Sequence, residues 1–342
     1  MSQLVYSREE LLRSHDYATE HRAAGRRLHG GFDAEGRYVP PRSLVRGPAI
    51  AAWTRALRAR GGDLLEADSS LLAGVRYPSE EQIKLLLREG LGQIFWDSLT
   101  ITGLIEARGR FLAEMEFPEI ADAVVEDVSE QAVGHLNRGL LHAHGIDEGG
   151  EPEKGIGGHD VMWFVLRDLA FGPRDWPTPE VPENIGRPDA ADRLVPEIPV
   201  AYERFIYFLL NLLMIEFRAE RGFSSTESIL RDPSLFRDRR SEAEKAAEMV
   251  GRIRTDEEIH VLSLRLYLGE LRGLTFRTAD GDLLPGDRVV DPLWNTIVTW
   301  ATVEQPKRMA EQQRKNLTER ILAHPGGERI LEQFNTLEDP SS

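Results

Sequence analysis

The most specific chemical pattern in the sequence is a glutamate followed three residues later by a histidine, Glu257 and His260. On an α-helix these side chains are about 60° apart, so a carboxylate and an imidazole could bind the same metal ion. Such a pair is also common on a solvated, charged helix face. The apolar residues from Val261 to Leu268 place His260 where the helix enters the core, which favours metal binding.

Two more glutamates occur in apolar surroundings. Glu216 ends the apolar run that begins at Phe205, and a buried carboxylate is costly unless it is paired, protonated or bound to a cation. The alternative is a helix end that emerges into water, because Arg218 follows closely. Glu106 is a similar candidate, although Arg110, four residues later, could be its salt-bridge partner instead.

The histidines in the middle of the chain leave the remaining ligands open. His135 is one candidate, and Glu130, five residues earlier, would reach the same helix face only through a π-bulge. His142 and His144 are better explained as histidines near a helix C-terminus, where the helix dipole favours a cation. His159 could complete a metal site, but its place beside a helix N-cap favours an exposed side chain.

Capping residues, prolines and glycines predict long helices that would position these groups. Ser79 and Gln82 form a capping box at the start of the first long helix, and Gly145 and Gly222 are expected to end two others. The segment 172–199 contains seven prolines and is expected to be an irregular crossover. The expected long helices are 79–111, 118–144, 200–221 and 241–273, with a shorter helix at 159–171.

Three regions follow from this pattern. Residues 1–78 are expected to form an N-terminal arm with short helices, including 48–60, and an irregular loop rich in glycine and proline. Residues 79–273 form the helical bundle that carries the metal site. Residues 274–342 contain a hairpin at Asp280 and Gly281 and a final helix at 292–323, which is kinked at Pro306 and packs on the bundle.

The predicted fold class is all-α, and its layout resembles the ferritin-like di-iron carboxylate superfamily. In that superfamily two helices each supply one Glu, and two others each supply a Glu-x-x-His motif, all projecting into a four-helix core. The resemblance covers residues 79–273 and rests on Glu106, Glu216, and Glu257 with His260. The sequence departs from the pattern at Ala132, three residues before His135. This departure leaves three interpretations. Glu130 supplies the missing carboxylate through a π-bulge, the site has an altered stoichiometry, or the bundle has lost its metals.

The resemblance implies a non-haem oxidase or oxygenase that activates O₂ on a small-molecule substrate. Two iron ions per chain, or manganese, would be its cofactors, and its electron donor is left open. Two alternatives remain: a metal-free helical binding or scaffold protein, and a dimetal oxidase built on a haem-oxygenase-like bundle.

Composition narrows the chemistry and the partners. The chain has no cysteine, which excludes disulfides and thiolate ligands, and a net charge of -15, which argues against nucleic acid and anionic membranes. Its 11 arginines against 6 acids in residues 1–60 suggest that a basic arm packs on an acidic body. The N-terminal residues do not resemble a signal peptide, and the longest apolar run is too short for a bilayer, so a cytoplasmic protein is expected. A homodimer is a separate expectation.

Overall fold

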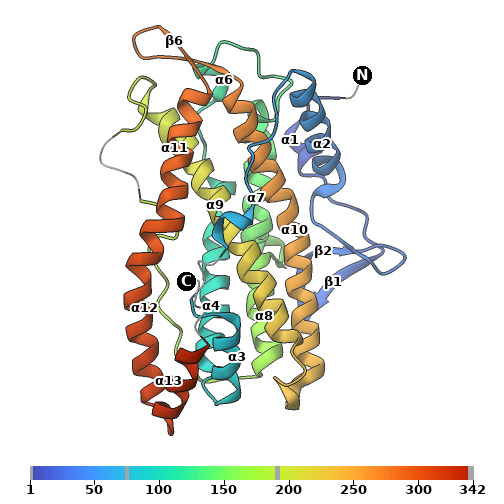
Figure 1. Ribbon diagram of the computed structural model, residues 1–342. Helices are drawn as coiled ribbons and strands as arrows, with labels where there is room; N and C mark the ends of the chain where they lie inside the picture. The colour runs from blue at the N-terminus through green and yellow to red at the C-terminus, as the bar shows by residue number, and fades with distance from the viewer. Residues whose placement is uncertain (1–2, 74–76, 189–192, 338–342) are drawn as a thin grey trace.

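The computed structural model describes residues 3–73, 77–188 and 193–337. The protein is mostly helical, which confirms the predicted class in its coarse form. Figure 1 shows long helices lying side by side. No helix in the described ranges combines the length and apolar character needed to cross a membrane. The helices that matter for the site are α4 (Gln93–Gly109), α7 (Leu141–Gly149), α8 (His159–Phe171), α9 (Val200–Arg231) and α10 (Arg240–Arg272).

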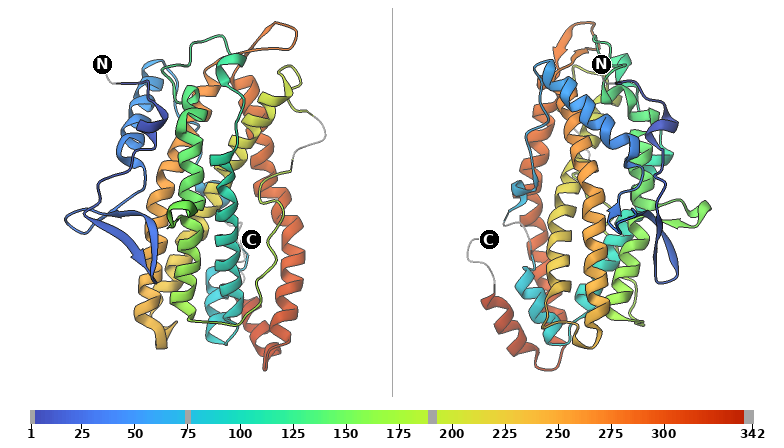
Figure 2. Two further views of the ribbon diagram at one scale, coloured as in Figure 1. Left: turned by 180° about the vertical axis from the view of Figure 1, so that it is seen from behind. Right: turned by 90° about the vertical axis from the view of Figure 1, so that its right-hand side faces the viewer.

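Helix α10 is central to the packing. It contacts α9 along most of its length and also contacts α8, while α4 packs against both α7 and α8. Helices α7 and α8 lie one above the other in the same column (Figures 1 and 2). Side chains from these five helices therefore face a common interior.

That interior contains two separate apolar clusters. The first cluster contains apolar residues of α9 up to Phe217 and of α10 from Leu264 onward. The second cluster contains apolar residues of α9 from Phe223 onward and of α10 up to Ile253. The stretch of α10 between them carries Glu257 and His260, both buried. The charged candidates thus lie in a polar layer that apolar packing closes at both ends.

The expected helix over 118–144 is wrong. In this range the structure has the short helix α6 (Ile120–Ala123), followed by irregular backbone. A 3₁₀ turn at Ala132–His135 and a π-helical turn at Leu136–Leu140 then lead into α7. Gly139 adopts a φ of 131°, which an L side chain rarely adopts, and it interrupts any continuous helix. The helix that reaches the interior is α7, which runs past the predicted stop at Gly145.

Two other helix boundaries also differ. The expected helix over 79–111 is divided into α3 (Glu80–Arg88) and α4, because Gly90 between them has a φ of 86°. A short helix α5 (Phe111–Glu114) follows. Helix α9 does not end before Gly222, as predicted, but continues through it to Arg231. The glycine is tolerated because Phe223 and residues beyond it are buried in the second apolar cluster.

The N-terminal arm contains strands where an irregular loop was expected. After α1 (Arg8–Leu11), β1 (Thr19–Ala23) and β2 (Arg26–Phe32) form an antiparallel pair, which β3 (Tyr38–Val39) extends. Strand β4 (Ile156–Gly157), immediately before α8, pairs in parallel with β2. The arm is therefore joined to the bundle beside His159. Helix α2 (Ser43–Ala59) ends the arm and starts earlier than expected.

The C-terminal region largely matches the prediction. The hairpin is present as β5 (Thr275–Arg277) and β6 (Leu283–Pro285). Helix α11 (Asp287–Thr299) continues through a wide turn at Trp300–Glu304 into α12 (Gln305–Leu322), so the irregularity precedes Pro306. A proline lacks the N–H that would bond to a carbonyl one turn earlier, which explains this position. A last helix, α13 (Gly327–Thr336), follows.

Two glycines test the corrected helices. A Cβ at Gly145 would overlap the backbone of Ala113, whereas a Cβ at Gly222 would meet no atom within 4 Å. We therefore expect Gly145→Ala to lower the free energy of unfolding by about 2 kcal/mol. Gly222→Ala should raise it by about 0.5 to 1 kcal/mol, because alanine favours the helix interior. Urea denaturation measures both, and destabilisation by Gly222→Ala would contradict a continuous α9.

Candidate metal centre

Seven buried side chains converge in the polar layer of the bundle. Their ligand atoms form two groups, within each of which all atoms lie within 4.8 Å of one another. One group is His144, Glu148, Glu216 and His260, and the other is Glu106, Glu148, His159 and Glu257. Helix α4 supplies Glu106, α7 supplies His144 and Glu148, α8 supplies His159, α9 supplies Glu216, and α10 supplies Glu257 and His260.

Glu148 lies between the two groups. Its Oε1 is 3.2 Å from Nδ1 of His260, and its Oε2 is 3.4 Å from Nδ1 of His159. Glu257 is placed in the same way, with Oε2 2.8 Å from Nδ1 of His260 and Oε1 3.1 Å from Nδ1 of His159. Each of these carboxylates thus places one oxygen beside a histidine of each group, and Glu148 belongs to both groups, as a carboxylate that bridges two metal ions must.

The outer members of the two groups differ. Nε2 of His144 lies 3.0 Å from Oε1 of Glu216, and the His144 ring stacks on His260 with centroids 3.9 Å apart. On the other side, Nδ1 of His159 lies 3.9 Å from Oε2 of Glu106. One group therefore has two imidazoles and the other has one.

Three of these buried atoms have ionic contacts but no hydrogen bond of regular geometry among the described residues: Nε2 of His144, Nδ1 of His159 and Oε1 of Glu148. Buried polar atoms usually make at least one regular hydrogen bond. These atoms are therefore candidate ligands of a cation, which would replace the protons that their ion pairs require.

The carboxylates at the edges of the centre resist ionisation in the absence of a metal. Burial, together with the charge of Glu148, raises the pKa of Glu106 well above its usual range. Burial and the charge of Glu257 raise the pKa of Glu216 to about 7. Both groups would keep a proton near neutral pH unless another positive charge took its place.

The bridging carboxylates and the imidazoles stabilise one another as ions. Burial opposes ionisation of Glu257, as does Glu148, but His260 and His159 outweigh both and lower its pKa to about 2. Burial likewise opposes the charged form of His260, but Glu257 and Asp147 raise its pKa well above the ordinary value. Without a metal, protonated imidazoles thus supply the positive charge that the carboxylates require.

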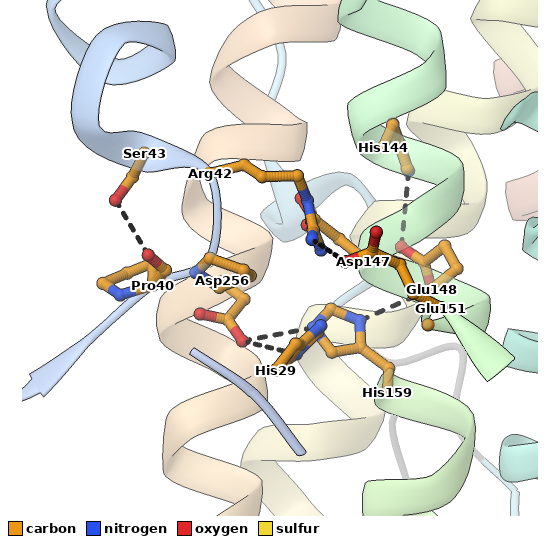
Figure 3. A network of polar contacts seen from close by, with 12 residues as sticks. His29, Pro40, Arg42, Ser43, His144, Asp147, Glu148, Glu151, His159 and Asp256 are labelled. Atoms are coloured by element: carbon orange, nitrogen blue, oxygen red, sulfur yellow. Dashed lines mark hydrogen bonds and ion pairs between the residues drawn. The ribbon is translucent and has the colours of Figure 1, made fainter. Parts of the chain in front are cut away.

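The rear nitrogen of His260 contacts a second buried carboxylate. Nε2 of His260 lies 3.1 Å from Oδ2 of Asp147, and Asp147 also accepts hydrogen bonds from Arg42 and Arg46 of the arm. Figure 3 shows Arg42 pointing at Asp147. Burial opposes ionisation of Asp147, but the two guanidinium groups hold its pKa well below the usual range. An ionised Asp147 keeps the proton on Nε2 of His260 and leaves Nδ1 free to bind a metal.

His159 has the same kind of support. Its Nε2 lies 3.4 Å from Oδ2 of Asp256, which also accepts a 2.8 Å hydrogen bond from the hydroxyl of Tyr38. Nε2 of His29 lies 3.2 Å from the same oxygen (Figure 3). Both Tyr38 and His29 belong to the arm, so the arm contacts the carboxylates behind two of the three imidazoles.

Four of the six residues predicted from the sequence meet in this centre: Glu106, Glu216, Glu257 and His260. The other two do not. Glu130 is exposed in a loop. His135 is buried, but its Nδ1 donates to the carbonyl of Gln131 and its Nε2 accepts from the backbone N–H of Tyr6. Both ring nitrogens are thus occupied, and the structure places neither Glu130 nor His135 among the ligand groups of the centre.

The residues that were missed lie on α7 and α8. His144 was interpreted as a capping histidine and His159 as an exposed neighbour of a cap, yet both are buried in the centre. Glu148 was not considered, because the expected helix ended before it. The signal was present: His144 and Glu148 are four residues apart, a spacing that places two ligands on one helix face as well as Glu-x-x-His does.

Comparison with protein-family models, with curated proteins and with solved structures finds no match for this chain.

The segment that holds His135 is anchored by a different glutamate. Glu270 of α10 accepts a 3.0 Å hydrogen bond from the backbone N–H of Val133, and Nη2 of Arg60 lies 3.6 Å away. Burial raises the pKa of Glu270 to about 7. Because this pKa is raised, the folded protein binds an extra proton between about pH 4.5 and 7, and Glu270 lowers stability as the pH rises through that window.

We therefore expect Glu270→Gln, which stays neutral and can still accept from Val133, to become increasingly stabilising with pH. Its free energy of unfolding relative to the unmodified protein should rise by about 2 kcal/mol between pH 5 and pH 8. Glu248→Gln, on the exposed face of α10, is the control. Parallel pH profiles for Glu270→Gln and the unmodified protein, measured by chemical denaturation, would refute the assignment.

Proposed function

We propose that the chain binds two iron ions, or two manganese ions, and uses them to activate O₂ for the oxidation of a small-molecule substrate. In this proposal α4, α7 with α8, α9 and α10 are the four columns of a ferritin-like bundle. The observation that carries it is the pair of buried ligand groups that share Glu148. Two ions with a shared carboxylate are the arrangement that such a pair would hold.

The charge of the ligand set fits two divalent cations. Four carboxylates with three neutral imidazoles carry a charge of -4, which two divalent ions balance to zero. Buried charge is tolerated only when it is paired in this way. The protons that Glu106 and Glu216 keep in the metal-free protein, because burial and neighbouring carboxylates raise their pKa values, would then be replaced by metal.

The ligand atoms favour iron or manganese. They are oxygen and nitrogen only, since the chain contains no cysteine, and imidazole with carboxylate ligands suits these metals. When bound, such a pair of ions supplies the electrons that reduce O₂ in the first step of an oxidation. The residues of the chain would hold the ions, exclude bulk water through the two apolar clusters, and keep the imidazoles in the required tautomer through Asp147 and Asp256.

The ligand order departs from the superfamily pattern. Helix α10 has the Glu-x-x-His motif as Glu257 and His260, but the other motif is replaced by His144 and Glu148 on α7 and by His159 on α8. A haem-oxygenase-like dimetal oxidase is therefore the alternative within the same chemistry. A metal-free scaffold is disfavoured, because it gives no reason to bury four carboxylates and three imidazoles together.

Metal content tests the proposal directly. Protein purified after iron or manganese supplementation should hold about two ions per chain by elemental analysis. Glu148→Gln and His260→Ala should each lose most of this metal, because Glu148 belongs to both groups and His260 to one. His324→Ala is the control, since His324 lies outside both groups and its ring bonds to the carbonyl of its neighbour Pro325.

Less than about a tenth of an ion per chain in the unmodified protein would overturn the proposal. Equal loss of metal from His324→Ala and His260→Ala would overturn the assignment of the ligands. The oxygen reaction is tested by mixing anaerobic, ferrous-loaded protein with O₂. We expect O₂ uptake in proportion to bound iron, and uptake by the metal-depleted Glu148→Gln variant at the same rate would contradict it.

The carboxylates behind the imidazoles give an independent test. Asp256→Asn removes the charge that holds Nε2–H of His159, so we expect metal affinity to fall by about 10- to 100-fold, measured by competition with a chelator. Asp168→Asn, on the exposed side of α8, should leave affinity unchanged. An unchanged affinity in Asp256→Asn would show that the contact between Asp256 and His159 does not support a metal ligand.

A further inference from the structure

A cavity of about 430 Å³ lies between α9 and α10 and reaches the metal centre. Its wall includes Glu257, one of the two carboxylates placed between the ligand groups. This size is sufficient for a small organic molecule. The cavity is the place in the described structure where a substrate could approach the centre that the proposed function requires, and the inference below rests on that function.

The inner part of the cavity is apolar. Phe217 of α9 is fully buried, and Val261 and Leu262 of α10 are half-buried along the wall. Val261 and Leu262 follow Glu257 by about one turn of α10. A molecule that lies beside the metal centre would therefore place carbon, not charge, against this part of the wall.

Arg265 lies at the far end of the cavity with unused donors. It is half-buried, its Nε donates to the carbonyl of Leu65, and no carboxylate of a described residue forms an ion pair with it. Arg254, the other guanidinium in the wall, is already paired with Glu227 at 2.6 Å. The terminal nitrogens of Arg265 thus form no ion pair with a described carboxylate, although the charge of Arg265 also acts on the exposed Asp63 and Asp68.

The acidic residues of the wall are less suited to bind a ligand. Asp68, Glu220 and Glu258 are all exposed at the rim. Asp68 also accepts a hydrogen bond from the backbone N–H of Ser70. Exposed carboxylates are well solvated and contribute little to an ion pair, whereas a half-buried guanidinium binds a carboxylate through strong charge-assisted hydrogen bonds.

We propose that this cavity is the substrate site and that it binds a monocarboxylic acid with an apolar body. The carboxylate contacts Arg265, and the body extends along Leu262, Val261 and Phe217 to the metal centre at Glu257. Glu257 and Arg265 are eight residues apart, or about 12 Å along the helix axis. The arginine side chain spans part of this distance, so an acid of about six to eight carbons fits, at about 1.3 Å per carbon of an extended chain.

Calorimetric titration of the metal-loaded protein with octanoate tests the proposal. We expect saturable binding, and about 10- to 100-fold weaker binding to Arg265→Gln, because the charge-assisted hydrogen bonds are lost. Arg272→Gln, on the same helix but paired with Asp291, is the matched control and should bind octanoate normally. Leu262→Trp, which fills the cavity, should also abolish binding while its metal content stays unchanged.

Octylamine and octanol distinguish a site for the acid from a merely apolar or acidic one. Both should bind more weakly than octanoate. Tighter binding of octylamine would assign the recognition to the rim carboxylates and overturn the proposal. The proposal would also be overturned if octanoate bound Arg265→Gln as tightly as the unmodified protein, or if it did not bind the unmodified protein. Metal content is measured on the same samples, so a protein that holds two ions but ignores octanoate refutes this inference alone, while a protein without metal refutes the proposed function.

Discussion

The structure depends on balancing the charge of four carboxylates buried in one small volume. In the metal-free protein, protons on Glu106, Glu216 and the imidazoles supply this balance. The balance works only if the imidazoles stay within about 3 to 4 Å of the carboxylates, since the attraction weakens with distance and with any water that enters. The two apolar clusters, one on each side of the polar layer, fix the distances between imidazoles and carboxylates and exclude water from them.

The N-terminal arm is part of this balance. Asp147 and Asp256 each precede one of the central glutamates, Glu148 and Glu257. Because neighbouring residues on a helix point about 100° apart, each pair sends one carboxylate into the centre and one to its outside. The arm meets both outer carboxylates, with Arg42 and Arg46 at Asp147 and with His29 and Tyr38 at Asp256. Arg42 and Arg46, two of the 11 arginines in residues 1–60, thus have a local role at Asp147.

Sequence patterns predicted those parts of the site that depend on local structure. Glu216 and Glu257 follow or precede long apolar runs on regular helices, so their burial can be predicted without knowing the fold. The contribution of α7 could not be predicted in this way, because glycines usually mark the end of a helix. Here α7 begins just after Gly139 and continues past Gly145. The roles of Asp147 and Asp256 depend on contacts across more than 90 residues of sequence, which no local pattern contains.

Helix α10 separates two tasks that a metal-dependent oxidation must combine. Asp256 faces the arm, where His29 and Tyr38 fix the carboxylate behind His159. Glu257, the next residue, faces both the metal centre and the cavity against α9. In the proposed oxidation, a substrate that enters beside α9 would therefore reach the centre without disturbing the hydrogen bonds that hold its histidines. The side of the centre formed by α4, α7 and α8 contributes no residue to the cavity wall. Access on one side and rigid support on the other follow from the position of one helix, which explains why α10 carries ligands, supports and cavity wall together.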